Sequence, residues 1–411
     1  MLLLVSSAWA FCGTFVGSAG SDLRNHASRV ILARSGDETT LTLAADYQGD
    51  LAAFGLIIPV PEVVTADDVR LINPDLIDRV DGWSEPRMVA YTCEDLATVD
   101  RSLPPMGCTD SKLSFSKGES AEEGVTVEAA FTEGEYEIVV LSAEESGDLL
   151  GWLDANGYTV PEGGEAILQE YIDAGVYFLA AKVSLDAVPS GQNWLNPLQI
   201  RYTSAAWSLP IRIGTIASGG EAQEVLVYAL TESDSAVGIS NYPEVTVDDE
   251  CMLRDAGDDF AVAYSDALDV ALDGEAGWIQ EYSWSLTTGC DPCTSQQGLT
   301  PEELEGLGFP SYHGRLTRLR VRYTPEQATQ DLTFYDTRIS DNAQIRYIRY
   351  LEDLEETFPV CNEGFMDNPG TCDAGQRAPV VGCAGAAPAT GVGLFGAFSG
   401  LLAVAALRRR A

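Results

Sequence analysis

Histidine is scarce in this sequence, and the shortage narrows the chemistry that the protein can perform. The chain has two histidines, His26 and His313, among its 411 residues. Serine and cysteine hydrolases of the triad type use a histidine base, and neither histidine lies near a Gly-x-Ser-x-Gly motif. Triad chemistry is therefore not expected. Internal repeats are absent too, which argues against a solenoid.

Basic side chains are also few. Lys and Arg together number 24 against 63 Asp and Glu, which gives a net charge of −39. Such a chain repels nucleic acid and anionic lipid headgroups, so we exclude nucleic acid as a partner. The acidic residues are spread along the chain, which is typical of a solvated surface. Weak binding of divalent cations is the alternative.

One acidic stretch, residues 255–259 with Asp266, does not follow the calcium-loop pattern. Gly257 stands where an oxygen ligand is needed, and Phe260 stands at the glycine position. A solvated acidic loop is the favoured interpretation. No metal ligand is assigned, and no cofactor is expected.

Charge is missing entirely from residues 384–407, which are followed by Arg408, Arg409 and Arg410. This stretch is long enough to cross about 30 Å of hydrocarbon as a helix, and the arginines mark its cytoplasmic end. At the other end, a short apolar run leads to Ala8-Trp9-Ala10, a signal-peptidase pattern. The sequence predicts an exported mature chain that begins at Phe11 and meets the membrane through its C-terminal helix.

The nine cysteines fit an exported protein, in which thiols pair. Cys383 lies at the start of the tail, and the others form an even set. We predict a local bridge between Cys93 and Cys108, and a disulfide loop between Cys361 and Cys372. For Cys290 and Cys293 a structural disulfide is favoured, with a redox pair or a metal site as alternatives. Cys12 and Cys251 remain, and are paired only by elimination.

Alternating and β-branched runs predict strands over most of the chain. The expected strands are residues 29–33, 40–44, 54–61, 124–131, 136–141, 176–185, 198–202, 209–213, 225–230, 315–323, 332–335 and 343–350, with 278–286 as a strand or short helix. Residues 248–273 are expected to mix helix and loop.

Helix signals are fewer. Thr65 ahead of Asp67 predicts a helix start, Pro74 opens a helix over 75–80, and Thr300 caps another. Apolar residues at helical spacing predict a hairpin of two helices, residues 144–156 and 165–174, each ending at a glycine and packed on a sheet. Its aromatic residues are interpreted as core. The fold class is α+β: β-rich, with mainly antiparallel sheets, a helical hairpin and a C-terminal transmembrane helix.

The predicted organisation is a signal peptide (1–10), a β-rich ectodomain (11–355), a disulfide loop and spacer (356–381), and a tail with the transmembrane helix (382–411). A division of the ectodomain into two subdomains near 240–250 is one option.

Several motifs together resemble a known family. They are Phe11-Cys12-Gly13, Tyr47-Gln48-Gly49, Ile58-Pro59-Val60-Pro61, Trp152-Leu153 with Asn156-Gly157-Tyr158, Asn196-Pro197-Leu198-Gln199-Ile200, Leu209-Pro210-Ile211-Arg212 and Cys290-Asp291-Pro292-Cys293. In this order they resemble the secreted bacterial family called domain of unknown function 2330, from about residue 11 to 350. The resemblance implies export and a shared fold. It supplies no activity and no catalytic residues.

The tail resembles a second pattern, the MYXO-CTERM sorting signal. The matching residues are Gly382, Cys383, the helix over 384–407, and Arg408, Arg409 and Arg410. The resemblance implies that a membrane protease acts near Cys383 and that the protein reaches the cell surface. The alternative is a permanent C-terminal anchor.

The sequence thus favours a cell-envelope protein, surface-displayed or membrane-anchored, that binds or scaffolds without catalysis, and its surface ligand is unknown. The rival is an envelope enzyme. It would be a thiol-disulfide oxidoreductase using Cys290 and Cys293, or a hydrolase using a pair of carboxylates that the sequence does not identify.

Overall fold

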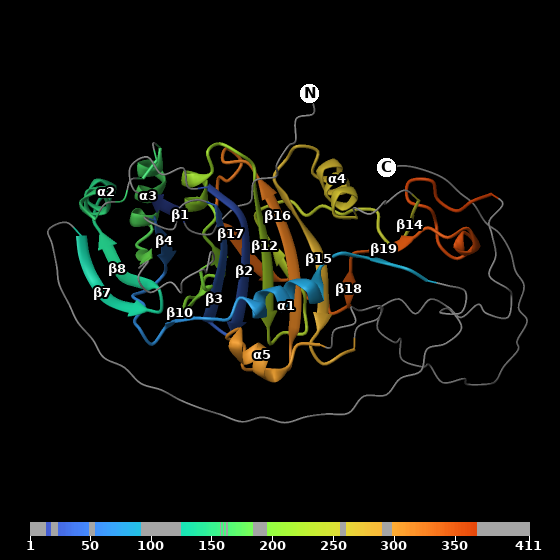
Figure 1. The fold of residues 1–411 in the computed structure, drawn as a ribbon, viewed down its shortest axis with the longest axis horizontal. Coiled ribbons are helices and arrows are strands. Elements are labelled where there is room, and N and C mark those ends of the chain that lie inside the picture. The colour runs from blue at the N-terminus through green and yellow to red at the C-terminus, as the bar shows by residue number, and fades with distance from the viewer. Residues whose placement is uncertain are drawn as a thin grey trace, which may run out of the picture.

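The computed structural model describes residues 14–17, 24–48, 54–91, 125–156, 158, 160–161, 163–183, 195–254, 260–289 and 298–367 (Figure 1). In this part of the chain the fold is β-rich, with mainly antiparallel sheets and few helices, as the sequence predicts. Two large sheets carry most of the strands, and two small sheets complete the set.

The larger sheet has eight strands. In spatial order they are β18 (Ala343–Gln344), β15 (Gly277–Ser285), β16 (Arg315–Tyr323), β12 (Gln223–Thr231), β2 (Arg24–Ser35), β3 (Glu38–Gln48), β10 (Leu198–Thr203) and β5 (Val69–Leu71). Neighbours are antiparallel except β12 and β2, which run parallel. The tight β2–β3 turn contains Gly36 at φ 58°, a conformation that favours glycine. Because the sheet combines strands from both sides of residues 240–250, that stretch does not divide it.

The second sheet has five strands, all antiparallel to their neighbours. Their order is β1 (Thr14–Gly17), β4 (Phe54–Val60), β9 (Tyr177–Val183), β8 (Tyr136–Ala143) and β7 (Val125–Glu133). Successive side chains of a strand point to opposite faces. Ile58, Val140 and Leu179 therefore point inward and pack in one buried cluster with Val30 and Val227 of the eight-stranded sheet. The main core lies between the two sheets.

The predicted helical hairpin is confirmed and covers the outer face of the five-stranded sheet (Figure 1). It consists of α2 (Ser146–Ala155) and α3 (Gly164–Asp173). Leu149, Leu153 and Leu168 are buried there against Phe178 of β9. Helix α3 ends where Gly175, at φ 73°, donates its N–H to the Ile172 carbonyl at 2.9 Å.

The outer face of the eight-stranded sheet is covered by α1 (Asp75–Ser84), α5 (Pro301–Gly306) and α4 (Phe260–Leu272). Helix α5 starts with the predicted cap. The Glu303 N–H donates to Thr300 Oγ1 at 3.2 Å, and the Thr300 N–H donates to the Glu303 carboxylate at 2.7 Å. The arrangement is therefore four layers: helices, sheet, sheet, helices.

Two three-stranded sheets lie beside these layers. One contains β11 (Ser208–Leu209), β17 (Leu332–Asp336) and β13 (Val237–Ile239). The other contains β14 (Met252–Leu253), β19 (Arg346–Arg349) and β6 (Arg87–Val89). Two short 3₁₀ helices are η4 (Ile213–Ala217) and η5 (Glu352–Leu354).

Two local predictions are wrong. The strand over 209–213 stops at Leu209, because Pro210 has no N–H for a ladder and the chain then turns into η4, with Thr215 N–H donating to the Arg212 carbonyl at 3.0 Å. The helix expected after Thr65 is only a turn before β5. Its Asp68 carboxylate accepts hydrogen bonds from the Thr65 N–H and hydroxyl.

No described helix is long and apolar enough to cross a bilayer. The transmembrane helix predicted over 384–407 lies outside the described residues.

Candidate functional site

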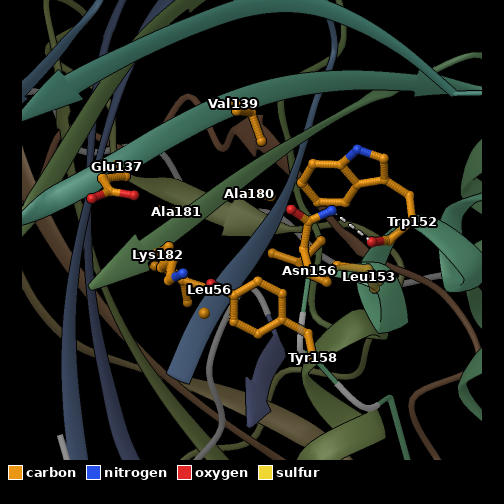
Figure 2. Close-up of a pocket in the computed structure, with 12 residues that line it drawn as sticks. Leu56, Glu137, Val139, Trp152, Leu153, Asn156, Tyr158, Ala180, Ala181 and Lys182 are labelled. Atoms are coloured by element: carbon orange, nitrogen blue, oxygen red, sulfur yellow. Dashed lines mark hydrogen bonds between the residues drawn. The ribbon is translucent and has the colours of Figure 1, made fainter. Parts of the chain in front are cut away.

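A pocket lies on the outer face of the five-stranded sheet, beside the C-terminal end of α2. Strands β4, β8 and β9 form its floor, and α2 with the residues that follow it forms its wall. Its cavity volume is about 140 Å³. Figure 2 shows Glu137 and Lys182 on one side, Trp152 and Asn156 on the other, and Tyr158 with its ring turned toward the space between them.

The strand register positions the floor. Glu137 and Val139 of β8 lie opposite Lys182 and Ala180 of β9, and all four point to the outer face. Ala180, and Gly55 of β4 opposite Lys182, fill little space. The cavity lies over these small residues, between the sheet and the C-terminal end of α2.

The end of α2 positions the wall. Trp152 and Asn156 are four residues apart and so share a helix face, and the Asn156 side-chain amide donates to the Trp152 carbonyl at 2.8 Å. The Tyr158 N–H then donates to the Leu153 carbonyl at 2.8 Å. These bonds close the helix end and return the chain toward the sheet, which places the Tyr158 ring over the floor.

Tyr158 is the most unusual residue of the pocket. Its side chain is 8% exposed, and its hydroxyl has no hydrogen-bond partner among the described residues. Burial, with a smaller contribution from the Glu137 carboxylate, raises the pKa of Tyr158 to about 12. The hydroxyl is therefore protonated at neutral pH and can donate a hydrogen bond into the pocket.

Glu137 and Lys182 carry the charges of the pocket. They are direct cross-strand partners and both are exposed. In the described part of the chain, no ion pair or hydrogen bond of either side chain is found. One positive and one negative group thus stand side by side at the pocket, each free to contact a ligand.

The comparison with known families supplies an identity. The sequence matches the family described as "Uncharacterized protein conserved in bacteria (DUF2330)" over residues 6–335. This chain belongs to the DUF2330 family. No curated protein and no solved structure matches it. The match confirms the resemblance of the quoted motifs to this family, and it covers every lining residue of the pocket.

One motif of that resemblance forms the wall of the pocket in this DUF2330 chain: Trp152, Leu153, Asn156 and Tyr158. Sequence reasoning interpreted the hairpin aromatics as core. That interpretation holds for Tyr171, which is buried, but Trp152 is half-buried and lines the pocket. The rarity of lysine is a signal that could have indicated the site. The chain has three lysines, Lys112, Lys117 and Lys182, and of these Lys182 lies in the described part.

A second cavity of about 340 Å³ lies at the β2–β3 turn, but its main charged groups are engaged. Arg34 donates to Thr39 Oγ1 and the Ser204 carbonyl and lies over the Trp207 ring. Asp336 accepts from the Ser233 hydroxyl and the Arg338 N–H. The pocket at α2 is therefore the stronger candidate.

A buried ionic network lies on the face of β16 toward α1 and α4. Arg318, Arg320 and Arg322 alternate along the strand and hold Glu281 and Glu224. Glu281 is 0% exposed and also accepts from the Tyr264 hydroxyl at 2.7 Å. Burial alone would raise the pKa of Glu281, but Arg320 and Arg318 outweigh it and lower the pKa. The network is satisfied internally, which is typical of a structural role.

A carboxylate pair suited to hydrolysis is not found at the pocket, whose only acidic lining residue is Glu137. Elsewhere in the described residues, buried Glu135 accepts from the Asn196 N–H and buried Glu355 from the Tyr350 hydroxyl. No group of three or more His, Cys, Asp and Glu side chains in the described ranges is arranged to hold a metal ion. Residues 255–259 lie outside those ranges.

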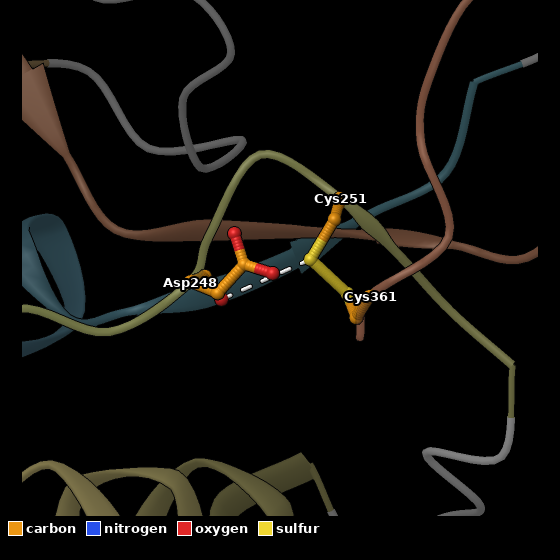
Figure 3. Close-up of a disulfide and its surroundings, with 3 residues drawn as sticks. All are labelled: Asp248, Cys251 and Cys361. Carbon is orange, nitrogen blue, oxygen red and sulfur yellow. Dashed lines mark hydrogen bonds between the residues drawn. A yellow bond between two sulfur atoms is a disulfide. The ribbon is translucent and has the colours of Figure 1, made fainter. Parts of the chain in front are cut away.

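One disulfide is found in the described residues, and it corrects two predicted pairs. Cys251 is bonded to Cys361 at an S–S distance of 2.04 Å (Figure 3). The predictions that Cys361 pairs with Cys372 and Cys12 with Cys251 are therefore wrong. The physical reason is backbone pairing between distant segments: the Met252 N–H donates to the Pro359 carbonyl at 2.8 Å and the Cys361 N–H to the Met252 carbonyl at 3.0 Å.

The other sequence-predicted residues lie outside the described ranges. They are Cys12, Cys93, Cys108, Cys290, Cys293, Cys372, Gly382, Cys383, Arg408, Arg409 and Arg410. The local bridges, the redox alternative and the sorting signal stay predictions.

Proposed function

We propose that this DUF2330 protein is a non-catalytic binding module of the bacterial cell envelope, and that the pocket at the end of α2 is its ligand site. The observation that carries the proposal is the Tyr158 hydroxyl, which is buried beside a cavity and has no partner among the described residues. A buried hydroxyl left unpaired costs about 1–3 kcal/mol. A ligand that hydrogen-bonds this group would recover that free energy.

The size and chemistry of the pocket support binding of a small molecule. A dry apolar cavity of roughly 150 Å³ is known to hold a molecule such as benzene, and this cavity is about 140 Å³. Ile57, Val139 and Ala180 supply apolar contacts, and Trp152 supplies an aromatic one. The lining residues include no serine, cysteine or histidine, so the pocket offers no nucleophile with a histidine base.

Export is the second part of the proposal. The support is the signal-peptidase pattern at Ala8-Trp9-Ala10, the cysteine content, and the Cys251–Cys361 disulfide, since disulfides persist mainly in oxidising compartments. The uncharged stretch over 384–407 serves as a membrane contact, and a sorting protease acts near Cys383. The termini and cysteine pairs of the protein isolated from its own cells test this part.

The ligand site is tested with a small neutral probe, isobutyramide, which combines a branched apolar group with an amide. We expect saturation-transfer NMR to detect its binding to the wild type and not to Ala180→Leu, which fills the pocket. Tyr158→Phe should weaken binding about five- to tenfold, because one hydrogen bond contributes about 1 kcal/mol.

Tyr158→Phe should also change the stability of the protein in a way that would not occur if the hydroxyl had a structural hydrogen bond. Removing an unpartnered hydroxyl should raise the free energy of unfolding of the ligand-free protein, by about 1 kcal/mol in urea titration. Tyr312→Phe, on a side chain that is 54% exposed, is the matched control and should change neither quantity. Equal probe binding by the wild type and a folded Ala180→Leu variant, or no binding by the wild type, would overturn the ligand site.

A further inference from the structure

The geometry points to a more specific ligand: a free α-amino acid whose apolar side chain enters the cavity while its ammonium and carboxylate contact Glu137 and Lys182. This inference rests on the proposed ligand site. Its starting observation is that the two charges of the pocket are opposite in sign, adjacent in the strand register and unpaired among the described residues.

The spacing of the two charges suits the head group of an amino acid. Directly opposed residues of an antiparallel pair have Cβ atoms about 5 Å apart, and an α-amino acid carries its ammonium and carboxylate on one carbon. One such molecule can therefore meet both side chains at once. An exposed ion pair between Glu137 and Lys182 themselves would contribute only about 0–1 kcal/mol, so it would not compete strongly with a ligand.

Charge complementarity excludes simpler ligands. A carboxylic acid without an ammonium group would bring a second negative charge to Glu137, and an amine without a carboxylate would bring a second positive charge to Lys182. The protein as a whole carries a net charge of −39, which further disfavours anions. A zwitterion avoids both repulsions and remains neutral overall.

The rest of the pocket completes the recognition. The Tyr158 hydroxyl stays protonated well above neutral pH and can donate to the carboxylate of the ligand. The whole cavity encloses about 140 Å³, and its apolar part, lined by Val139, Ala180 and the Trp152 ring, suits a branched side chain such as that of valine or leucine.

The test compares leucine with three compounds that carry fewer charges: N-acetylleucine has no ammonium, leucinamide has no carboxylate, and isobutyramide has neither charge. Titration calorimetry on the full chain should show that leucine binds at least about tenfold more tightly than N-acetylleucine or leucinamide, and more tightly still than isobutyramide, because a hydrogen bond to a charged group contributes about 1.5–3 kcal/mol.

Two variants assign the charges to their partners. Lys182→Met should weaken leucine about tenfold and leave leucinamide nearly unchanged, because only leucine offers a carboxylate. Glu137→Gln should weaken leucine and leucinamide and leave N-acetylleucine unchanged or improved. Glu165→Gln, at an exposed glutamate of α3 outside the pocket, is the matched control and should change no affinity.

Failure of this inference can be told from failure of the ligand site itself. If isobutyramide binds as tightly as leucine, and Ala180→Leu removes both, the pocket is a ligand site but not one for amino acids. If leucine binding survives Ala180→Leu or is unchanged by Lys182→Met and Glu137→Gln, the assignment is overturned. If none of the four compounds binds the wild type, both proposals fall.

Discussion

Single residues decide the character of the pocket, and Tyr158 shows how. Its place in the sequence, after a helical run and a glycine, predicts only that it follows a helix end. What makes it a candidate contact is that the hydroxyl is buried at the edge of a cavity without a described partner. Burial and partners depend on residues far away in the chain, namely β4, β8 and β9, so they could not be predicted from the local sequence.

Asp249 provides a residue-scale prediction about pH. Burial, together with the nearby Glu250 and more weakly Asp248, raises the pKa of Asp249 to about 6, although the N–H and charge of Arg346 act in the opposite direction. The folded state therefore holds this proton at a higher pH than the unfolded state, whose aspartates titrate near about 3.9. The protonated Asp249 carboxyl therefore stabilises the folded state. This contribution is complete below about pH 3.9 and is lost as the pH rises through about 6.

The variant Asp249→Asn should remove this loss. We expect its free energy of unfolding to exceed that of the wild type by an amount that grows from pH 5 to pH 7 and reaches about 1 kcal/mol, after allowance for the partial exposure of the side chain. Urea titrations at several pH values measure it, and pH 5 keeps the protein above its pI of about 4.1. Asp266→Asn, on the exposed face of α4, controls for loss of a negative charge. A difference that does not vary with pH would contradict the prediction.

At the scale of elements, strand β16 shows what the alternation of residues in a sequence predicts and what it does not. The alternation of arginine with Leu319 and Val321 correctly predicts a strand with one apolar face. The same alternation suggests that the arginine face meets water. Instead α1 and α4 cover it, and Arg318 is 3% exposed. Which elements cover a face is a tertiary property that the pattern of one strand does not contain.

The buried network predicts a large effect of Glu281. Glu281→Gln keeps the shape of the side chain but leaves Arg318 and Arg320 without this carboxylate. Breaking a buried ion pair by neutralising one partner costs about 3–5 kcal/mol, and we expect a loss of that order in urea unfolding.

The matched control lies on the same row of arginines. Asp269→Asn removes one carboxylate partner of Arg322 and leaves the other, Glu224. The Asp269 side chain is 64% exposed, and exposed pairs contribute about 0–1 kcal/mol. If the two variants lost equally little stability, the network would not be the structural feature described above.

At the scale of the whole molecule, the disulfide ties the end of the described chain to its middle. Cys251 and Cys361 are 110 residues apart, and the family match ends at residue 335. Cys361 therefore lies beyond the matched region and fixes the segment that follows the sheets.

Peptide mapping of the protein isolated from its own cells tests export and the remaining cysteine predictions together. Without reduction, we expect a linked peptide pair containing Cys251 and Cys361, a mature N-terminus at Phe11, and a stable bridge between Cys290 and Cys293. A C-terminus near Cys383 would support sorting, whereas an intact residue 411 would support a permanent anchor. Free thiols at Cys251 and Cys361 with an unprocessed N-terminus would contradict export.

The sequence by itself determined what local chemistry controls. Periodicity gave most strands and the α2–α3 hairpin, the Thr300 cap gave α5, and the motifs gave the family. Each strand, each helix and the cap rests on residues within about a dozen positions of one another, where propensity and capping act.

Only the tertiary structure decided the partner of Cys251, the covering of the arginine face and the pocket. Parallel pairing of β2 with β12 joins residues 24–35 to 223–231, and the pocket joins Gly55 to Lys182. Such contacts form because burying two apolar sheet faces against each other outweighs the entropy of closing long loops. The free energy that selects them belongs to the whole chain rather than to any one segment.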